Sequence, residues 1–341
     1  GHVPESLQRG KAGVGETLDE RREELRSILL NGFEQRPPKV KRRYDSNAQK
    51  WRTISEPIQW PDQYVHHALI QVLKPIMMRG MDPFCCGSIE RRGVHYGARA
   101  IKKWMKSDRR GTRYCLSFDI RHFYDSLTKE TVMKHLRRRI KDARTLDLIE
   151  RTLTYDVLIG AYTSQWYANT VLTELDHLIR EQGGAAHFLR YIDNFTVFGS
   201  SKRKLRRIFH MAQQWLKDNG MEIKSDWQIF PSHKRLPSAL GYRYGRGYTI
   251  LRKRKLLRLK RFAARYRKRS QNGWKPPARW AAGMLSRMAQ LRHCCNVTLW
   301  RIICRGQKIV SALKVSVREK SKQMQHINWP AYMAARREGF A

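Results

Sequence analysis

Acidic residues are the scarce class in this chain of 341 residues. It has 29 Asp and Glu against 69 Lys and Arg, which gives a formal net charge of +40. A surplus of this size exceeds what solubility requires and is typical of proteins that bind a polyanion. Because 41% of the residues are hydrophobic and 10 are Trp, the chain is not a disordered basic tail. We expect a folded protein that binds nucleic acid.

The chain also has few cysteines and no long apolar run. None of its 6 Cys has C-x-x-C spacing, so we expect reduced thiols and no zinc site. No stretch approaches the roughly 18 apolar residues of a membrane span, and no secretory signal sequence is visible. These absences predict a cytoplasmic protein with no membrane partner.

Two short strings each place an acid inside an apolar, strand-forming run: Asp119 in SFDIRHFYDSL and Asp193 in RYIDNFTVFGS. A buried carboxylate is costly unless it is paired with a cation, and an Arg partner is the alternative to a metal. Polymerases use two metals about 3.5–4 Å apart for in-line phosphoryl transfer. The strings therefore predict a nucleotidyltransferase that uses two Mg²⁺ ions, with Asp119, Asp193 and the Ile120 carbonyl as ligands.

Hydrophobic periodicity predicts an α+β fold with a small antiparallel sheet and helices on one face. A turn at Asp45-Ser46-Asn47 predicts a hairpin over 39–56. We expect further strands around Asp119 and Asp193, near 221–224, and over 226–230 and 239–250. We expect helices over 18–31, 62–78, 95–105, 128–155, 164–180, 201–219, 251–270, 278–293 and 297–318.

The composition changes at Leu251, where LRKRKLLRLKRFAARYRKRS contains eleven Lys and Arg and no acid. Leu256, Leu259 and Phe262 keep a helical stripe, which indicates a folded helix rather than a tail. Charge of one sign on such a helix is typical of a surface that follows a nucleic-acid backbone. The candidate contacts are Arg252, Lys253, Arg254, Lys255 and Arg258.

Together these strings resemble bacterial reverse transcriptases of diversity-generating retroelements, which are related to group II intron reverse transcriptases. SFDIRHFYDSL is similar to their first catalytic motif, IGAYTSQWYANTVLTELDHLI to the second, and YIDNFTVFG to the tyrosine-x-Asp-Asp motif. Most reverse transcriptases have Gln-Gly and Ser-Pro where this chain has Ile159-Gly160 and Ser164-Gln165. In the resembled family this pattern is associated with error-prone copying at template adenines.

The resemblance implies a right-hand polymerase fold with fingers, palm and helical thumb. It places an N-terminal extension over 1–36, fingers with the start of the palm over 37–110, the palm over 111–250, and a basic helical thumb and tail over 251–341. The implied partners are template RNA, a DNA primer or cDNA, deoxynucleotides and a small basic accessory protein oligomer. The implied source is bacterial or phage-encoded.

The resemblance also implies roles for individual residues. The ring of Tyr124 would lie under the incoming sugar and collide with a 2′-hydroxyl, so that deoxynucleotides are favoured. Lys50 and Arg52 would hold the triphosphate of the nucleotide. Gly160 would allow the backbone to approach the primer–template or nucleotide closely. The remaining nucleotide-binding candidates are Ile159 and Gln165. The nucleic-acid-binding candidates are Asn169 and, in the thumb, Arg292, His293 and Asn296.

Asn194 departs from the family, in which a second Asp follows the first. Asn keeps a carbonyl oxygen but removes a charge, so we expect weaker metal binding and Mn²⁺ as a substitute, with Asn194 still in the catalytic set. Two alternatives stay open: an anti-phage defence reverse transcriptase with the same chemistry, and a catalytically weak RNA-binding module. Asn194 is the one feature that favours the module, whereas Lys50, Arg52 and Tyr124 favour an enzyme.

Overall fold

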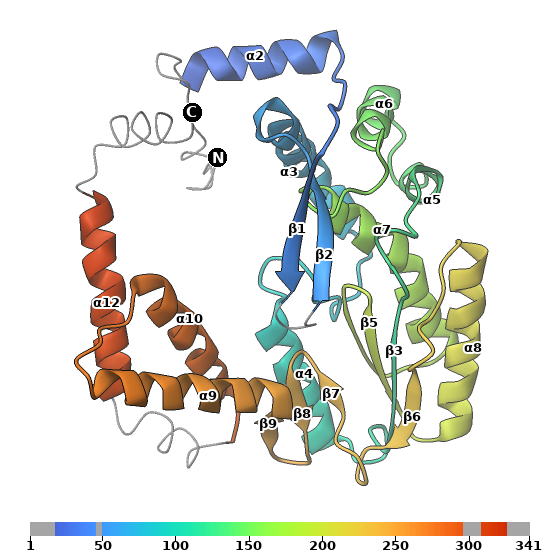
Figure 1. Cartoon of the computed structure of the whole chain (residues 1–341). Helices are drawn as coiled ribbons and strands as arrows, with labels where there is room; N and C mark the ends of the chain where they lie inside the picture. The colour runs from blue at the N-terminus through green and yellow to red at the C-terminus, as the bar shows by residue number, and fades with distance from the viewer. Residues whose placement is uncertain (1–17, 46–49, 296–307, 326–341) are drawn as a thin grey trace. The chain divides into compact units, whose positions relative to one another are not determined.

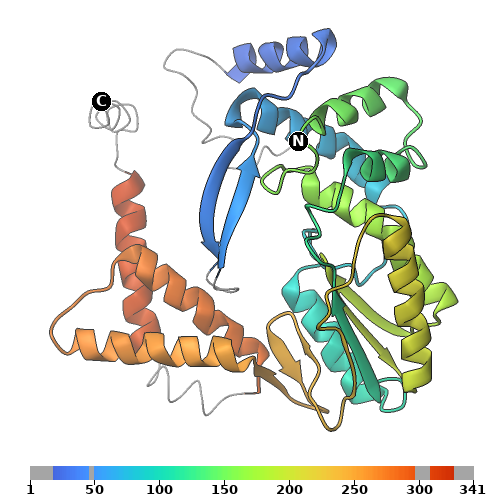
Figure 2. The same cartoon turned by 45° about the vertical axis from the view of Figure 1, so that its right-hand side comes forward.

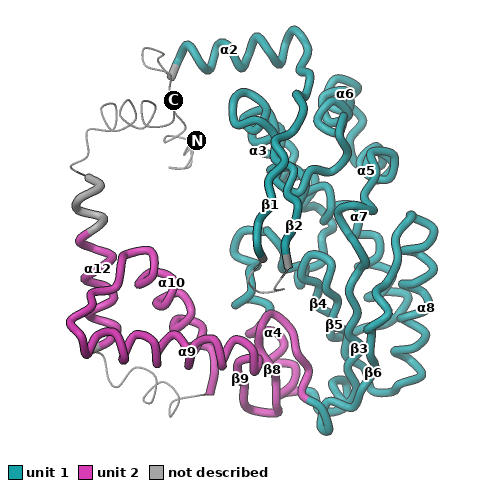
Figure 3. The backbone as a smooth tube through the Cα atoms, viewed as in Figure 1, with its two compact units in different colours: residues 1–97, 108–235 teal, residues 98–107, 236–341 magenta. Residues whose placement is uncertain are grey.

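The computed structural model describes residues 18–45, 50–295 and 308–325 (Figure 1). The chain divides into two compact units, one of residues 1–97 with 108–235 and one of residues 98–107 with 236–341 (Figure 3). Its helices and strands form the mixed α+β fold that the sequence predicts. None of the described helices is long and apolar enough to cross a membrane. The fingers, palm and thumb boundaries stay a prediction.

The first unit is built on a four-stranded antiparallel sheet with the strand order β4-β5-β3-β6 (Figures 1 and 2). Helix α8 packs on β3, β5 and β6, and helix α7 packs beside α8. Phe118 of β3 stacks on Phe195 of β5 with ring centroids 4.5 Å apart, and Phe209 of α8 meets Phe118 edge-on. The bounds are β3 Tyr114–Asp119, β4 His187–Tyr191, β5 Asn194–Gly199, β6 Gln228–Pro231, α7 Ser164–His177 and α8 Lys202–Asp218.

The other elements of this unit include the predicted hairpin, formed by β1 (Lys39–Asp45) and β2 (Lys50–Glu56). Helices α2 (Leu18–Asn31) and α3 (Tyr64–Met78) also lie where periodicity predicts them. Helix α4 (Val94–Ser107) contributes residues to both units.

The single helix predicted over 128–155 is wrong, because two helices occupy that range: α5 (Lys129–Leu136) and α6 (Ala143–Thr152). Asp142 accepts a hydrogen bond from the Thr145 N–H at 2.7 Å and thereby caps the start of α6. An Asp at this position satisfies a backbone donor that a continuous helix would already pair. The apolar period runs through the break, which is why periodicity alone missed it.

The second unit contains a three-stranded antiparallel sheet followed by helices. Helix α10 packs against both α9 and α12. Trp280 of α10 stacks on Phe262 and Tyr266 of α9, with ring centroids 5.5 and 5.9 Å apart. The basic segment is therefore a packed helix, as predicted. The bounds are β7 Ser238–Ala239, β8 Tyr242–Tyr244, β9 Thr249–Leu251, α9 Lys253–Ser270, α10 Ala278–Ala289 and α12 Lys308–Gln325.

Candidate active site

Asp193 lies in the turn of the β4–β5 hairpin. Tyr191 pairs with Asn194 across the hairpin, so Ile192 and Asp193 form its two-residue loop. Ile192 has a φ of 60°, which is uncommon and strained for a β-branched residue. The prediction that Asp193 lies within a strand is therefore corrected. Ile is not a typical turn residue, although Asp193 and Asn194 beside it are residue types that turns favour.

The hairpin brings Asp193 to the end of β3, where Asp119 lies. Asp119 pairs in register with Asn194, and the Ile120 N–H donates a hydrogen bond to the Asp193 carbonyl at 3.2 Å. Burial raises the pKa of Asp119 to about 6, and the nearby Asp193 carboxylate adds to the rise. The end of β3 and the β4–β5 turn thus bring the half-buried carboxylates of Asp119 and Asp193 close enough to interact electrostatically.

Lys224 also belongs to this site, although the sequence did not single it out. Its Nζ lies 2.6 Å from Asp119 Oδ1, and this contact opposes the rise in the pKa of Asp119. The Lys224 N–H donates to the Asp119 carbonyl at 2.9 Å, next to a bridge between Ile120 and Ile223. The main-chain register brings Lys224 here, so no sequence motif identifies it.

Asn194 orients one of the two acids. Its side-chain amide donates a hydrogen bond to Asp193 Oδ1 at 3.0 Å. An ionised Asp in this position has no hydrogen to donate and would repel Asp193 instead. Asn194 is exposed and lies opposite Asp119, so it is also on the edge of the carboxylate site.

The donor set suits a hard divalent cation. The carboxylate of Asp193 helps to raise the pKa of Asp119, and Mg²⁺ typically uses one or two carboxylates together with substrate phosphates. The parts of the chain that the structure describes hold no cluster of three or more His, Cys, Asp or Glu suited to a metal. Substrate phosphates would supply the rest of the coordination of an ion held by these carboxylates. Ile120 as a carbonyl ligand stays a prediction.

Tyr124 is held beside the carboxylates. The Gln165 amide donates a hydrogen bond to the Tyr124 hydroxyl, and the Ser88 hydroxyl donates to Gln165 Oε1 at 3.0 Å. Burial raises the pKa of Tyr124, and the charge of Asp193 contributes to this rise. The phenol is therefore neutral, with its ring fixed at one side of the site.

The two predicted triphosphate cations lie on β2 of the hairpin. Lys50 pairs in register with Asp45, and Arg52 pairs with Arg43. Arg52 is exposed, while the Lys50 side chain lies outside the described set. Their role in holding a triphosphate stays a prediction.

Gly160 makes its close approach to β2. Its N–H donates to the Ser55 carbonyl at 3.0 Å, and its carbonyl accepts from Gln63 Nε2 at 2.8 Å. An added Cβ would lie 2.4 Å from Glu56 Cγ and 2.9 Å from Glu56 Cα. The glycine is thus required for packing against the protein's own hairpin. The predicted approach of Gly160 to the primer–template or nucleotide stays a prediction. Ile159 beside it is 38% exposed.

The family of the chain follows from a match that covers most of the first unit. Residues 38–234, more than half of the chain, match the family model for reverse transcriptase (RNA-dependent DNA polymerase). The chain belongs to this reverse transcriptase family. Protein YkfC of Escherichia coli (strain K12) is 26% identical over 193 residues, in a match that covers 51% of this chain and 50% of that protein. The reverse transcriptase thus spans about half the length of the curated relative it matches.

Solved telomerase structures are also similar to the reverse transcriptase. Telomerase from Candida albicans, in complex with a TWJ fragment of telomeric RNA, is 12% identical, with a TM-score of 0.49. That match covers 82% of this chain and 55% of the telomerase chain. Apo telomerase from Candida tropicalis is 10% identical, covers 62% of this chain and 47% of that chain, and has a TM-score of 0.47.

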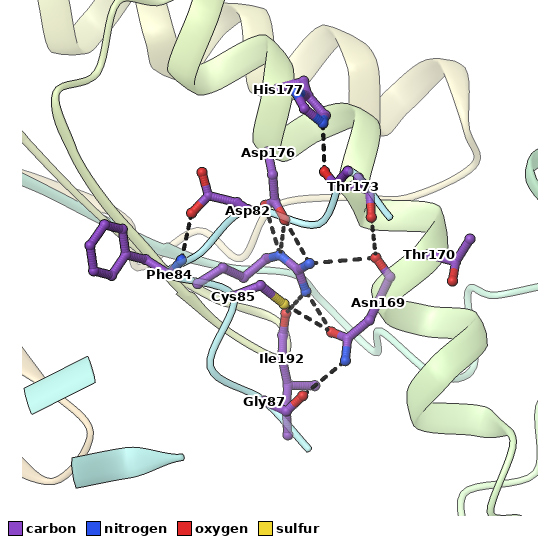
Figure 4. A network of polar contacts seen from close by, with 12 residues as sticks. Asp82, Phe84, Cys85, Gly87, Asn169, Thr170, Thr173, Asp176, His177 and Ile192 are labelled. Atoms are coloured by element: carbon purple, nitrogen blue, oxygen red, sulfur yellow. Dashed lines mark hydrogen bonds and ion pairs between the residues drawn. The ribbon is translucent and has the colours of Figure 1, made fainter. Parts of the chain in front are cut away.

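Asn169 is buried in the reverse transcriptase, so the prediction that it contacts nucleic acid is wrong. Its side chain lies on α7, one turn after Gln165, and is 2% exposed. Its Oδ1 accepts from Arg190 Nη1 at 2.9 Å, and its Nδ2 donates to the Gly87 carbonyl at 2.9 Å (Figure 4). Both amide groups are therefore used inside the protein. Sequence reasoning missed Arg190 and its partner Asp176, because their pairing depends on how α7 meets β4.

The basic residues of the second unit divide into two groups. Arg252 donates to the Ser238 hydroxyl at 2.7 Å, and Lys255 lies over the Tyr242 ring at 5.8 Å, so both turn toward the small sheet. Burial lowers the pKa of Arg252 and that of Lys255. Asn296 lies outside the described residues. Arg252 is nevertheless exposed and Lys255 half-exposed, and the other candidates, which are Lys253, Arg254, Arg258, Arg292 and His293, are also exposed or half-exposed.

Proposed function

We propose that this reverse transcriptase copies an RNA template into DNA by two-metal nucleotidyl transfer at Asp119 and Asp193. The observation that carries the proposal is the meeting of these acids at the end of β3 and the β4–β5 turn, where the charge of Asp193 helps raise the pKa of Asp119. Burial of mutually repelling carboxylates is unfavourable without a cation. Divalent metal binding would offset that cost.

The chain's own residues would divide the work at this site. Asp119 and Asp193 would hold two Mg²⁺ ions, which when bound activate the primer 3′-hydroxyl and stabilise the leaving pyrophosphate. The Asn194 amide keeps one oxygen of Asp193 engaged and so directs the other. Lys224 neutralises Asp119 when no metal is present and would be released to other acceptors once a metal arrives.

Selection of deoxynucleotides would depend on Tyr124. A ring fixed by a hydrogen bond cannot move aside for a 2′-hydroxyl without breaking the Gln165 contact. Rejection of a larger group by a rigid pocket wall is worth about 10–200-fold in specificity. We therefore assign Tyr124 to sugar discrimination and Gln165 to holding its ring.

We further propose that the copying is error-prone and serves a diversity-generating retroelement. Ile159-Gly160 and Ser164-Gln165 support this subtype through their resemblance to that family. Gln165 contacts Tyr124, so this residue of the Ser-Gln pair would border the proposed nucleotide site. The same resemblance supports a small basic accessory oligomer as partner. The exposed basic residues of α9 would follow the backbone of the template and primer.

Primer extension on an RNA template with a DNA primer tests the polymerase. We expect extension in Mg²⁺ or Mn²⁺ by the wild type and none by Asp193→Asn, which keeps the shape of the side chain but loses its charge. Asp125→Asn is the matched control, because Asp125 is an exposed acid of the same string. Extension by Asp193→Asn at the wild-type rate would rule out this site. Tight RNA binding without extension by the wild type would favour the RNA-binding module.

Sequencing the extension products tests the subtype separately. We expect misincorporation concentrated opposite template adenines, and a change in rate or yield when the neighbouring gene's product is added. Errors spread evenly over the four template bases would contradict the diversity-generating assignment while leaving the polymerase assignment in place.

A further inference from the structure

We propose that Arg190, together with Asn169 and Asp176, fixes the conformation of the Ile192–Asp193 turn and is thereby a positioning residue for Asp193. The inference rests on the proposed function in one respect, the role of Asp193 as a metal ligand. It concerns residues on the side of the turn that faces α7, none of which contacts the two carboxylates in the described network.

The ion pair of Arg190 with Asp176 is buried completely, with both side chains 0% exposed. Arg190 Nε donates to Asp176 Oδ1 at 2.7 Å and Arg190 Nη2 donates to Oδ2 at 2.7 Å. Burial alone would lower the pKa of Arg190, but the Asp176 carboxylate outweighs it and raises that pKa. Buried ion pairs commonly add no net stability over apolar residues of the same size. A specific structural task is therefore the better explanation for this pair.

The third nitrogen of the Arg190 guanidinium, Nη1, hydrogen-bonds to the Ile192–Asp193 turn. Arg190 Nη1 donates to the Ile192 carbonyl at 3.1 Å and to Asn169 Oδ1 at 2.9 Å (Figure 4). Ile192 is the residue with a φ of 60°, a conformation that persists only where neighbouring contacts enforce it. The planar fork of Arg can hold Asp176 and the turn at once, which a Lys cannot do.

A second contact with the turn comes from the segment between α3 and α4, which contains Gly87. The Asn169 amide donates to the Gly87 carbonyl, and the backbone of Gly87 lies against Ile192. A Cβ at Gly87 would be 2.6 Å from Ile192 Cγ1 and 2.8 Å from Ile192 N. This segment runs along β4, since the Cys86 N–H donates to the Arg190 carbonyl at 2.8 Å and the Arg190 N–H donates to the Phe84 carbonyl. Asn169 therefore joins both supports of the turn.

Loss of the Asn169 amide would release Arg190 Nη1 and the Gly87 carbonyl together. The turn would then relax from its strained conformation, and Asp193 would leave the position it holds near Asp119. Outer contacts that orient metal ligands commonly affect metal affinity or activity by 10–100-fold. An effect of that size distinguishes a positioning contact from one that only contributes stability.

The test compares two matched pairs in the full chain. Asn169→Ala removes the shared amide, and Thr170→Ala, on the same helix, removes an equally buried hydroxyl that donates to the Trp166 carbonyl within the helix. Gly87→Ala places a methyl group against Ile192, whereas Gly93→Ala adds one where nothing lies within 4 Å. The second pair tests the turn without changing any polar group.

Each variant is measured for thermal stability, for primer–template affinity and for extension rate. Bound Mn²⁺ is titrated by electron paramagnetic resonance in a complex with RNA template, a dideoxy-ended primer and a dNTP. We expect Mn²⁺ affinity and extension rate to fall about tenfold or more in Asn169→Ala and Gly87→Ala, with primer–template affinity unchanged. Thr170→Ala and Gly93→Ala should match the wild type in both properties.

Equal Mn²⁺ affinity and equal rates within each pair, after correction for stability, would overturn the positioning role. That outcome requires an active wild type, so it differs from failure of the proposed function, in which the wild type itself shows no extension.

Discussion

The amide of Asn194 donates a hydrogen bond to Asp193 Oδ1 at 3.0 Å, while Asn194 itself pairs in register with Asp119. Asn194 is thus a neutral residue that connects the two acids of the reverse transcriptase. A second Asp at this position would add charge where the pKa of Asp119 is already raised. Substitutions at Asn194 therefore separate the contribution of charge from that of orientation.

For Asn194→Asp we expect a lower half-saturating Mg²⁺ concentration in primer extension, because the added charge strengthens the attraction for the cation. For Asn194→Ala we expect a higher one, because the donor to Asp193 is lost and no charge is gained. Titrating Mg²⁺ over single-turnover extension checks both. If Asn194→Ala leaves the Mg²⁺ requirement unchanged or lowers it, the orienting role of the amide is wrong.

The charge of Asp119 should destabilise the metal-free protein. Its pKa in the folded chain is about 6, above its ordinary value of 3.8, so the folded state binds the proton more tightly than the unfolded state does. Stability from this group is full below pH 3.8 and is lost as the pH rises through about 6. Asp119→Asn should therefore raise the free energy of unfolding at pH 7.5, by at most about 3 kcal/mol, less the loss of the Lys224 contact.

Denaturant unfolding of both proteins in EDTA at pH 7.5 and at pH 3.5 measures this difference. The two should be equally stable at the lower pH, and Mg²⁺ at pH 7.5 should stabilise the wild type alone. A variant that is less stable than the wild type at pH 7.5 would show that Asp119 is a structural acid paired with Lys224.

Removing the ring of Tyr124 should admit ribonucleotides. For Tyr124→Ala we expect the ratio of kcat/KM for a deoxynucleotide to that for a ribonucleotide to fall about tenfold or more. Tyr124→Phe keeps the ring but loses the Gln165 contact that fixes it, so it should lose part of the discrimination and less than Tyr124→Ala does. Steady-state incorporation of a single nucleotide on an RNA template gives both ratios. Unchanged discrimination in Tyr124→Ala would place the sugar elsewhere.

A methyl group at Gly160 should disturb the hairpin, because it would overlap Glu56 Cγ and approach Glu56 Cα. Overpacking of this kind destabilises by about 1–3 kcal/mol. Since β2 also carries Arg52, we expect the KM for dNTP to rise in Gly160→Ala more than kcat falls. Gly93→Ala is the control for an added methyl group in open space. A change in kcat alone would mean that β2 does not hold the triphosphate.

Local patterns predicted most of the elements of the reverse transcriptase. Apolar residues at helical spacing located α3 and α8, and the turn residues near Ser46 located the β1–β2 hairpin. The two wrong predictions of elements, the single helix over 128–155 and the strand through Asp193, share one cause. A local contact can end a helix or a strand although the spacing of its apolar residues continues unchanged. Asp142 caps a new helix inside an uninterrupted apolar period, and Ile192, a β-branched residue, takes a turn conformation in the middle of a strand-forming string.

The sequence predicted a site residue only where that residue stands out from its immediate neighbours in the sequence. Asp119 and Asp193 are acids in apolar strings, and the structure brings them together. Lys224 and Arg190 lie in strings that look ordinary, because their importance arises from strand register and from burial against α7. Asn169 was assigned to the correct helix but to the wrong side of it.

Single-turnover extension of a DNA primer on an RNA template, with RNA binding measured in the same samples, is the most direct measurement on this protein. We expect Mg²⁺-dependent incorporation of deoxynucleotides by the wild type, and its loss in Asp119→Asn and in Asp193→Asn, with RNA affinity retained. Incorporation by either variant at the wild-type rate would contradict the assignment of the catalytic site to these two carboxylates.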